Sequence, residues 1–483
     1  MFETTFKNLD RALRKDDGCS TELDYIEQTS WVLFLKYLDD YETDRASSAQ
    51  LAGEKYERLL NEEFSWKNWA APKNKDGKID YNKTLTGDDL KDFVAQKLFP
   101  YLSSFKRTTE NANTLQYKIG EIFSELKNKI QSGYTLREVI DKVDELRFRS
   151  NEEKHEMSSL YEDKIKNMGN AGRNGGEYYT PRPLIKKIVE VVNPVIGNKV
   201  YDGAVGSAGF LCEAYEFLRH SKELSATEYE QLQTSTLYGK EKKSLAYIIG
   251  VMNMILHGIE APNIVHTNTL AENISDIEEK DKVDIILANP PFGSETEHEQ
   301  IQHNFPIRSG ETAYLFLQHF IKKLRTGGRC GIVIKNTFLT NDDAILLRKQ
   351  LLEECNLYAI LELPKGAFTG TVVKTVVLFF EKGTKTKNIW YYQLNTGRSL
   401  TKTNPLTEAE LSDFISLEKI KATSENSWSV SINDIDTTTW NLSPVNPAKK
   451  NLSVRRFSSE IIEDLAFLNE EFEVSVSAVK ELL

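Results

Sequence analysis

The sequence predicts an α/β protein built on a doubly wound sheet, with an all-helical region before the sheet and a helical tail after it. Two observations carry this prediction. From about residue 170 to 385, short runs of β-branched residues alternate with amphipathic helical segments, which is typical of parallel strands joined by crossover helices. Residues 1–150 instead place apolar side chains at helical spacing, as in Trp31, Phe34, Leu35 and Leu38.

These patterns divide the chain into three expected regions. They are a helical N-terminal domain over residues 1–150, the sheet domain over residues 151–400, and a C-terminal segment over residues 401–483 that ends in a helix from about Ser458.

The expected strands are the β-branched or aromatic runs that lie between turn residues. They are residues 199–201, 236–238, 263–266, 283–288, 331–334, 358–363 and 375–380. Between the fourth and fifth runs, residues 312–324 place apolar side chains on one helical face and are followed by Gly327 and Gly328. This order of strands and helices is what a crossover-connected sheet requires.

Composition excludes several classes of protein. With 40% hydrophobic and 28% charged residues the chain reads as globular. Apolar runs such as residues 283–288 are far shorter than the roughly 20 residues of a membrane span, and the start Met1-Phe2-Glu3-Thr4 lacks a signal-peptide pattern, so we expect a cytoplasmic protein. The four cysteines form no Cys-x-x-Cys pair, which argues against a structural zinc site or a disulfide framework.

The charge balance restricts how the chain could bind a nucleic acid. Its formal net charge is −11, whereas neutralising a phosphate backbone requires a basic surface. Either a local basic strip or a partner subunit could supply the positive charge, and composition leaves both open.

The most specific motif is Asn289-Pro290-Pro291-Phe292, which directly follows the apolar run 283–288. Ligands of open α/β sheets bind beyond the carboxyl ends of the strands, so the motif lies where a site is expected. Two consecutive prolines remove two N–H donors, and the loop therefore presents carbonyl oxygens that suit an amine donor. We expect these four residues to be catalytic.

A second motif, from Tyr201 to Phe210, is a strand end followed by a loop of small residues that opens a helix. Small residues allow the backbone to approach a ligand closely. An acidic residue after the next strand is expected to bind ribose hydroxyls, and Glu241 has that place, although residues 221–235 lengthen its distance from the loop.

The third motif is Glu177-Tyr178-Tyr179-Thr180-Pro181-Arg182. Thr180 is expected to cap a helix whose first turn tolerates Pro181 and Pro183.

In this order, the three motifs and Glu241 resemble the gamma-class amino-methyltransferases. Two further segments, Glu311 to Phe316 and Leu363 to Phe368, resemble the modification subunits of type I restriction-modification systems in particular, and the resemblance covers most of the chain. It implies a Rossmann-like methyltransferase sheet and transfer of a methyl group from S-adenosyl-L-methionine to the 6-amino group of a flipped adenine in double-stranded DNA.

The resemblance also implies roles for individual residues. Asn289, Pro290, Pro291 and Phe292 would be catalytic, with Phe292 stacked on the base. The cofactor would be bound by Glu177, Tyr178, Tyr179, Thr180, Pro181, Arg182, Asp202, Ser207, Ala208, Gly209, Glu241 and Asn268. Asp202 would lie near the methionine part and Asn268 near the adenine part, and no metal is implied. Gly203 departs from the family's more common Asp-Pro-Ala pattern and adds backbone freedom to the loop.

By the same resemblance, a separate specificity subunit reads the DNA sequence, two modification subunits join one specificity subunit, and a restriction subunit completes the complex. This agrees with the acidic charge and with the lack of an obvious groove-reading motif. The C-terminal helix and the N-terminal domain are then candidates for docking and for closing around DNA.

Three alternatives remain open at this stage. A protein glutamine methyltransferase uses a similar Asn-Pro-Pro-aromatic loop. A nicotinamide-dependent dehydrogenase is disfavoured because the glycine loop lacks the Gly-x-Gly-x-x-Gly spacing. A DNA-binding scaffold with a degenerate site is disfavoured because both the cofactor loop and the amine loop are intact.

Overall fold

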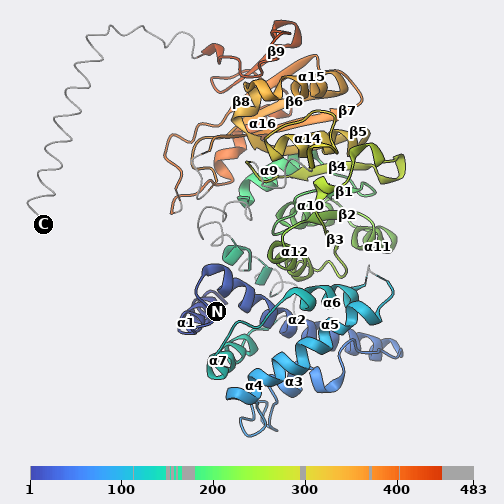
Figure 1. Cartoon of the computed structure of the whole chain (residues 1–483), viewed down its shortest axis with the longest axis vertical. Coiled ribbons are helices and arrows are strands. Elements are labelled where there is room, and N and C mark those ends of the chain that lie inside the picture. Colours follow the sequence, from blue (N-terminus) through green and yellow to red (C-terminus); the bar gives the residue numbers. More distant parts are fainter. Residues whose placement is uncertain are drawn as a thin grey trace, which may run out of the picture.

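The computed structural model describes residues 2–111, 114–147, 153, 157–158, 161–165, 180–293, 301–368, 373–401 and 403–448. Figure 1 shows two layers along the long axis, a helical N-terminal layer and a sheet covered by helices on both faces. The expected helix from Ser458 and the motif residues Glu177, Tyr178 and Tyr179 lie outside the described residues.

The N-terminal layer is helical, as the apolar spacing predicts. Its helices are α1 (Phe2–Leu13), α2 (Glu22–Ala52), α3 (Trp66–Trp69), α4 (Gly87–Phe93), α5 (Phe99–Thr108), α6 (Leu115–Glu125) and α7 (Gly133–Asp144). The long α2 begins with a capping box between Thr21 and Asp24 and ends at Gly53, whose φ of 75° is the left-handed conformation of a helix C-cap. Its middle is buried because the other helices pack around it.

The sheet has nine strands in the order β3-β2-β1-β4-β5-β7-β6-β8-β9. Their bounds are β1 (Val200–Asp202), β2 (Leu237–Glu241), β3 (Asn263–His266), β4 (Val283–Ala288), β5 (Leu324–Lys335), β6 (Cys355–Glu362), β7 (Thr375–Lys382), β8 (Asn388–Gln393) and β9 (Ser427–Ser431). Each expected strand overlaps one of these, and the mixed doubly wound α/β class is confirmed.

The expected parallel strands with crossover helices describe β3 to β5, but two strands of the sheet, β7 and β9, run antiparallel to their neighbours. The strands from β3 to β5 are parallel, but β7 runs antiparallel between β5 and β6, and β9 runs antiparallel to β8. The described residues of the connection from β6 to β7, 363–368 and 373–374, contain no helix of the kind that usually joins parallel strands. Because β9 pairs with β8, the sheet also continues past residue 400, and the subdivision of the chain at that residue stays a prediction.

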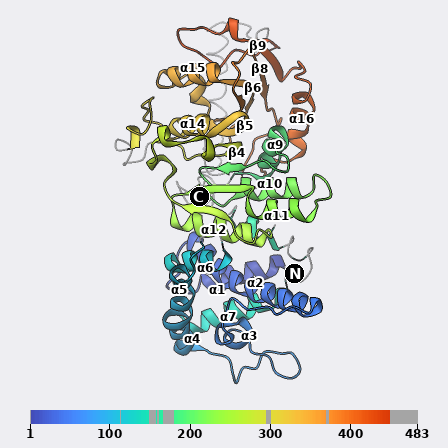
Figure 2. The same ribbon diagram turned by 90° about the vertical axis from the view of Figure 1, so that its right-hand side faces the viewer.

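Helices cover both faces of the sheet (Figure 2). On one face lie α9 (Arg182–Val192), α10 (Gly209–Arg219) and α12 (Ser244–Leu256), and on the other lie α14 (Thr312–Lys323) and α15 (Ile345–Glu354). The side chains of β4 alternate between the hydrophobic cores on the two faces of the sheet. Ile285 and Leu287 pack in the core with α9, α10 and α12, and Ile286 and Ala288 pack in the core with α14 and α15. This explains why residues 283–288 read as one continuous apolar run.

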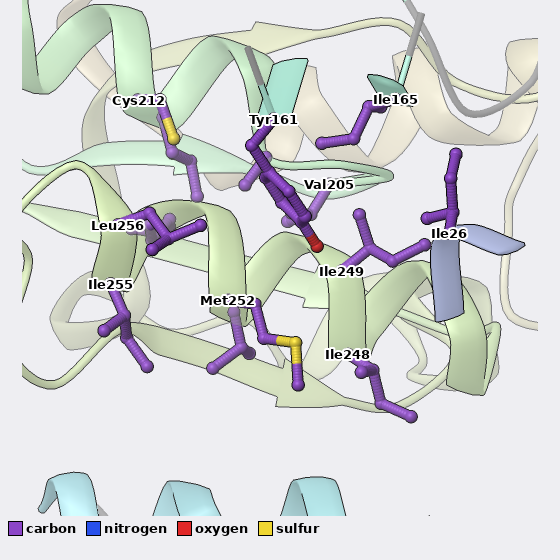
Figure 3. Packing of buried hydrophobic residues seen from close by; sticks show 14 of the residues in the cluster. Ile26, Tyr161, Ile165, Val205, Cys212, Ile248, Ile249, Met252, Ile255 and Leu256 are labelled. Atoms are coloured by element: carbon purple, nitrogen blue, oxygen red, sulfur yellow. The ribbon is translucent and has the colours of Figure 1, made fainter. Parts of the chain in front are cut away.

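The two layers are joined through a buried cluster around Tyr161. Figure 3 shows its ring among Ile26 of α2, Ile249 and Met252 of α12, and Val205. The buried Tyr161 hydroxyl donates to Ser30 Oγ at 2.8 Å. The helical layer is therefore packed against the sheet domain by both apolar and polar contacts. No helix among the described residues is long and apolar enough to cross a membrane.

Candidate active site

The functional motifs converge at one edge of the sheet. Asp202, Glu241 and Ala288 are the last residues of β1, β2 and β4, which are adjacent and parallel. Parallel strands end at the same edge, so the loops that follow meet there. This juxtaposition brings the glycine loop, Glu241 and the Asn289 loop together as expected.

The loop from Gly203 to Ala208 approaches its neighbours closely. A Cβ on Gly203 would lie 2.8 Å from Cε1 of Phe320, and Gly206 and Ala208 have φ of 54° and 64°. A side chain at position 203 would clash with Phe320 of α14, so a glycine is needed there, whereas Gly206 is needed for its left-handed backbone conformation. Ala208 is the N-cap of α10, so the loop leads directly into that helix.

Asp202 is a buried carboxyl with one unsatisfied oxygen. Its Oδ1 accepts the Ala204 N–H at 2.9 Å, and its Oδ2 has no hydrogen-bond partner among the described residues. Burial raises the pKa of Asp202 to about 8, against the lowering effect of the Ala204 N–H and with a further raising effect of Glu241. A cation placed at Oδ2 would therefore stabilise the ionised form of the Asp202 carboxyl.

The Glu241 carboxylate accepts backbone hydrogen bonds from two different loops. Its Oε2 accepts the Gly206 N–H at 2.8 Å, and its Oε1 accepts the Lys243 N–H at 2.8 Å. Each carboxylate oxygen has a second acceptor position, which leaves room for hydroxyl donors. Nearby, Asn268 Oδ1 accepts the Leu270 N–H at 3.1 Å, and Thr269 Oγ1 donates to the Gly203 carbonyl at 2.6 Å.

The two polar atoms of the Asn289 amide have different surroundings. Its Nδ2 donates to Thr180 Oγ1 at 3.0 Å, while its Oδ1 is buried and has no hydrogen-bond partner among the residues that the structure describes. The prediction that Thr180 caps the following helix is wrong. The N-cap of α9 is Pro181, which forms no side-chain capping bond, and the Thr180 hydroxyl is turned to Asn289 instead.

Two cavities meet at Asn289. The larger has about 690 Å³ of empty space, part of which is open to solvent. The smaller encloses about 280 Å³. They share Ala204, Gly206 and Asn289. The larger is lined by Gly203, Ala204, Gly206, Glu241, Lys242, Lys243, Asn268, Thr269, Leu270, Asn289, Pro291, Ile301, Thr312 and Phe316, and the smaller by Thr180, Ile185, Asp202, Ala204, Val205, Gly206, Ser207, Gly209, Phe210 and Asn289.

Contacts from Glu311, Thr312 and Lys335 hold the end of the Asn289 loop. Glu311 Oε1 accepts the Gly293 N–H at 2.5 Å, and Thr312 donates its hydroxyl to the Gly293 carbonyl at 2.6 Å. The Nζ of Lys335 pairs with Glu311 Oε2 at 2.7 Å and lies 5.9 Å from the Phe292 ring centre. The segment from Glu311 to Phe316 was singled out by its resemblance to type I modification subunits, but neither that resemblance nor the position of Lys335 after a predicted strand assigned these residues a role.

Some expected site residues line neither cavity. They are Pro181, Arg182, Ala208, Pro290 and Phe292.

The side chain of Arg182 is bound by neighbouring protein groups. Its guanidinium pairs with Glu162 and donates to the Gly209 carbonyl at 2.6 Å. Glu162, Cys212 and His257 bring ligand atoms within 4.8 Å of one another, as in a metal site, but Arg182 already supplies a positive charge to Glu162. This cluster therefore stabilises the start of α9.

Comparisons with known proteins agree with this geometry. A family model described as N-6 DNA Methylase matches residues 152–453, and one described as HsdM N-terminal domain matches residues 4–143. The methylase subunit of the type I restriction enzyme EcoEI from Escherichia coli is 35% identical, with 92% of this chain and 90% of that protein covered.

Solved structures give the same result. A modification subunit assigned to a type I restriction enzyme of Vibrio vulnificus is similar with a TM-score of 0.81 and 34% identity, covering 93% of this chain and 98% of that one. A chain from a study of complex assembly and conformational transition of the type I R-M system is similar with a TM-score of 0.79 and 33% identity, covering 100% of this chain and 98% of that one.

Proposed function

This chain belongs to the N-6 DNA methylases, as a modification subunit of the type I restriction-modification kind, and we propose that Asn289 is the residue at which it activates the 6-amino group of adenine in DNA. The observation that carries the proposal is that Asn289 lines both cavities and that its buried Oδ1 has no hydrogen-bond partner among the described residues.

The chemistry requires an acceptor at this position. The lone pair of the adenine amine is delocalised into the ring, so the amine is a poor nucleophile. Hydrogen bonds from the amine to Asn289 Oδ1 and to the Pro290 carbonyl localise the lone pair toward the incoming methyl group, and this effect is strongest in the transition state. The N–C bond forms as the donor's S–C bond breaks, and the amine then loses a proton.

S-adenosyl-L-methionine is the proposed methyl donor, and it supplies an electrophilic methyl group on a sulfonium. Asp202 Oδ2 binds its ammonium group, because this buried oxygen has no hydrogen-bond partner among the described residues and would gain one from a cation. Glu241 binds the ribose hydroxyls and Asn268 lies at the adenine ring. The loop residues Ser207, Ala208 and Gly209 and the segment from Glu177 to Arg182 complete the proposed cofactor site.

Phe292 is proposed to stack on the flipped adenine. Its ring is half-buried, with the Lys335 ammonium 5.9 Å from its centre. Stacking on an aromatic side chain repays part of the cost of removing a base from the duplex.

DNA sequence is proposed to be read by a separate specificity subunit, with two modification subunits to one of it and a restriction subunit in the full complex. The net charge of −11 supports a partner that supplies phosphate contacts. The segment from about Ser458 to Leu483, which the sequence predicts to be a helix, is the proposed docking element. Co-purification of a chain ending at residue 455 with the specificity subunit would count against that assignment.

The proposal is tested by transfer of radiolabelled methyl groups from S-adenosyl-L-methionine to DNA, with the specificity subunit co-expressed. We expect label as 6-methyladenine, reduced about 100-fold or more in Asn289→Ala, as for loss of one hydrogen-bonding group in a transition state. The variant's cofactor affinity should stay close to that of the wild type. Label on protein and none on DNA would instead favour the glutamine methyltransferase alternative.

A further inference from the structure

We propose that Glu162 is a positioning residue through which the helical N-terminal layer sets the affinity for the cofactor. The inference rests on the proposed cofactor site and adds to it a residue that lines neither cavity. Glu162 lies in a helical turn, residues 161–165, that contacts both the helical layer and the sheet domain. It binds Arg182, which in turn binds the cofactor loop at Gly209.

The helical layer fixes one side of this turn. The Tyr161 hydroxyl donates to Ser30 Oγ of α2 at 2.8 Å, and the buried Lys164 ammonium pairs with Asp10 of α1. The Tyr161 ring is also buried in the apolar cluster of Figure 3. Because Ser30 and Asp10 both belong to the helical layer, the position of the turn follows that of α1 and α2.

On its other side the turn binds Arg182 through Glu162. Arg182 Nε donates to Glu162 Oε2 at 2.5 Å, and the two side chains are only 17% and 15% exposed. Glu213 Oε2 is farther from the guanidinium, at 3.7 Å from Nη1, and His257 Nε2 lies 3.3 Å from Glu162 Oε1. A charge that is mostly buried is costly to separate from its partner, so Glu162 determines where the guanidinium lies.

Arg182 joins the two segments that form the smaller cavity. Its Nη1 donates to the carbonyl of Gly209, the first residue of α10, at 2.6 Å, and Gly209 lines this cavity. Thr180, two residues before Arg182, lines the same cavity with Asp202. A planar guanidinium holds a carboxylate and a carbonyl at once in a fixed geometry. A shift of Arg182 would therefore change the spacing of the two segments at the proposed methionine part of the site.

A double-mutant cycle tests whether Glu162 and Arg182 act together. The dissociation constant of S-adenosyl-L-methionine is measured by titration calorimetry for the full chain, E162Q, R182M and the double variant, well below the melting temperature of each. We expect each single variant to bind about tenfold more weakly. The double variant should lose at most about threefold more, because both substitutions break the same link.

Two further variants separate the helical layer from general surface charge. K164M removes the ion pair with Asp10 and alters no residue of either cavity, so an affinity loss of about threefold would show that the layer acts at a distance. K186M is the control, since Lys186 lies on the same helix α9 in an exposed pair with Glu408, and its affinity should stay within about twofold of the wild type. An unchanged affinity in E162Q, or losses in E162Q and R182M that simply add, would overturn the proposal.

A second measurement distinguishes positioning from a role in folding alone. By linkage, a layer that affects cofactor binding must itself respond to the cofactor. Hydrogen–deuterium exchange of the α1 and α2 amides is measured without cofactor and with saturating cofactor. We expect the cofactor to slow exchange in the wild type and to slow it less in E162Q. Exchange that does not respond in the wild type, or that slows equally in both proteins, refutes the inference.

The outcomes for the wild type separate this inference from the proposed function. If the wild type binds no S-adenosyl-L-methionine, the proposed function itself fails. If the wild type binds it and E162Q binds it equally well with a lower melting temperature, Glu162 supports only the fold, and this inference alone fails.

Discussion

The raised pKa of Asp202 predicts that the cofactor binds more tightly as pH rises from 6 to 7. In the free protein, burial raises the pKa of Asp202 to about 8, so the carboxyl is mostly protonated in this range. The ammonium group of S-adenosyl-L-methionine stays protonated there, since α-amino groups titrate near 8. Binding therefore requires Asp202 to release its proton to gain the ion pair.

The magnitude follows from the fraction of Asp202 that is ionised. With a pKa of about 8, this fraction is about 1% at pH 6 and about 9% at pH 7. The apparent affinity is the intrinsic affinity multiplied by the ionised fraction, so the dissociation constant should fall about ninefold over this unit of pH. About one proton should be released per cofactor bound.

The stability of the ligand-free protein should change with pH in the opposite direction to the cofactor affinity. The folded-state pKa of Asp202 lies above its ordinary value of 3.8, so between about pH 4 and pH 8 the ligand-free fold holds a proton that the unfolded chain releases. Stability of the ligand-free protein from this group should fall as pH rises through that window. Added cofactor should offset the loss, and more strongly at pH 7 than at pH 6.

The assay is isothermal titration calorimetry at several pH values, in buffers of different ionisation enthalpy. Asp202→Asn keeps the oxygen that accepts the Ala204 N–H but cannot ionise, so its affinity should be weaker and independent of pH. Methylthioadenosine, which lacks the ammonium group, is the control ligand and should bind equally at both pH values. A wild-type affinity that does not change with pH, or no proton release, would refute the reasoning.

Two further predictions concern contacts outside the cofactor site. Glu311 and Lys335 are a half-buried ion pair at the end of the Asn289 loop, so E311Q and K335M should each slow methylation about threefold to tenfold, and the double variant should recover part of the lost rate. Base flipping in these variants is measured by the fluorescence of 2-aminopurine at the target position. If the rate losses of the two single variants simply add in the double variant, the two residues do not act together. Arg348 is fully buried and donates to the backbone carbonyls of Phe338, Asn341, Thr439 and Trp440. R348M would leave these buried carbonyls without a donor, so it should lower the free energy of unfolding, measured by urea denaturation, by about 3 kcal/mol. A urea midpoint equal to that of the wild type would show that these hydrogen bonds contribute little to stability.

Local patterns account for the parts of the fold that could be predicted. The strand at residues 283–288 was predicted with its observed bounds because a continuous apolar run ends at Asn289 and two prolines. The helix at residues 312–324 was predicted to within one residue for a similar reason, since its apolar face has helical spacing. Both signals are contained in a dozen neighbouring residues.

The direction of β7 could not be read from its own residues. A buried parallel strand and a buried antiparallel strand have the same apolar composition, and only the path of the connecting chain decides between them. Thr180 was misassigned for a related reason. Its sequence neighbours suit a helix cap, but a partner 109 residues away competes for the same hydroxyl.

The sequence by itself determined the class of the fold, the family and the loops that carry the chemistry, because periodicity, turn residues and short motifs are local properties. The burial of Asp202 with its raised pKa, the pairing of Arg182 with Glu162 and the bond from Asn289 to Thr180 could be seen only in the three-dimensional structure. Burial and hydrogen-bond partners depend on which segments meet in space, and residues distant along the chain supply them.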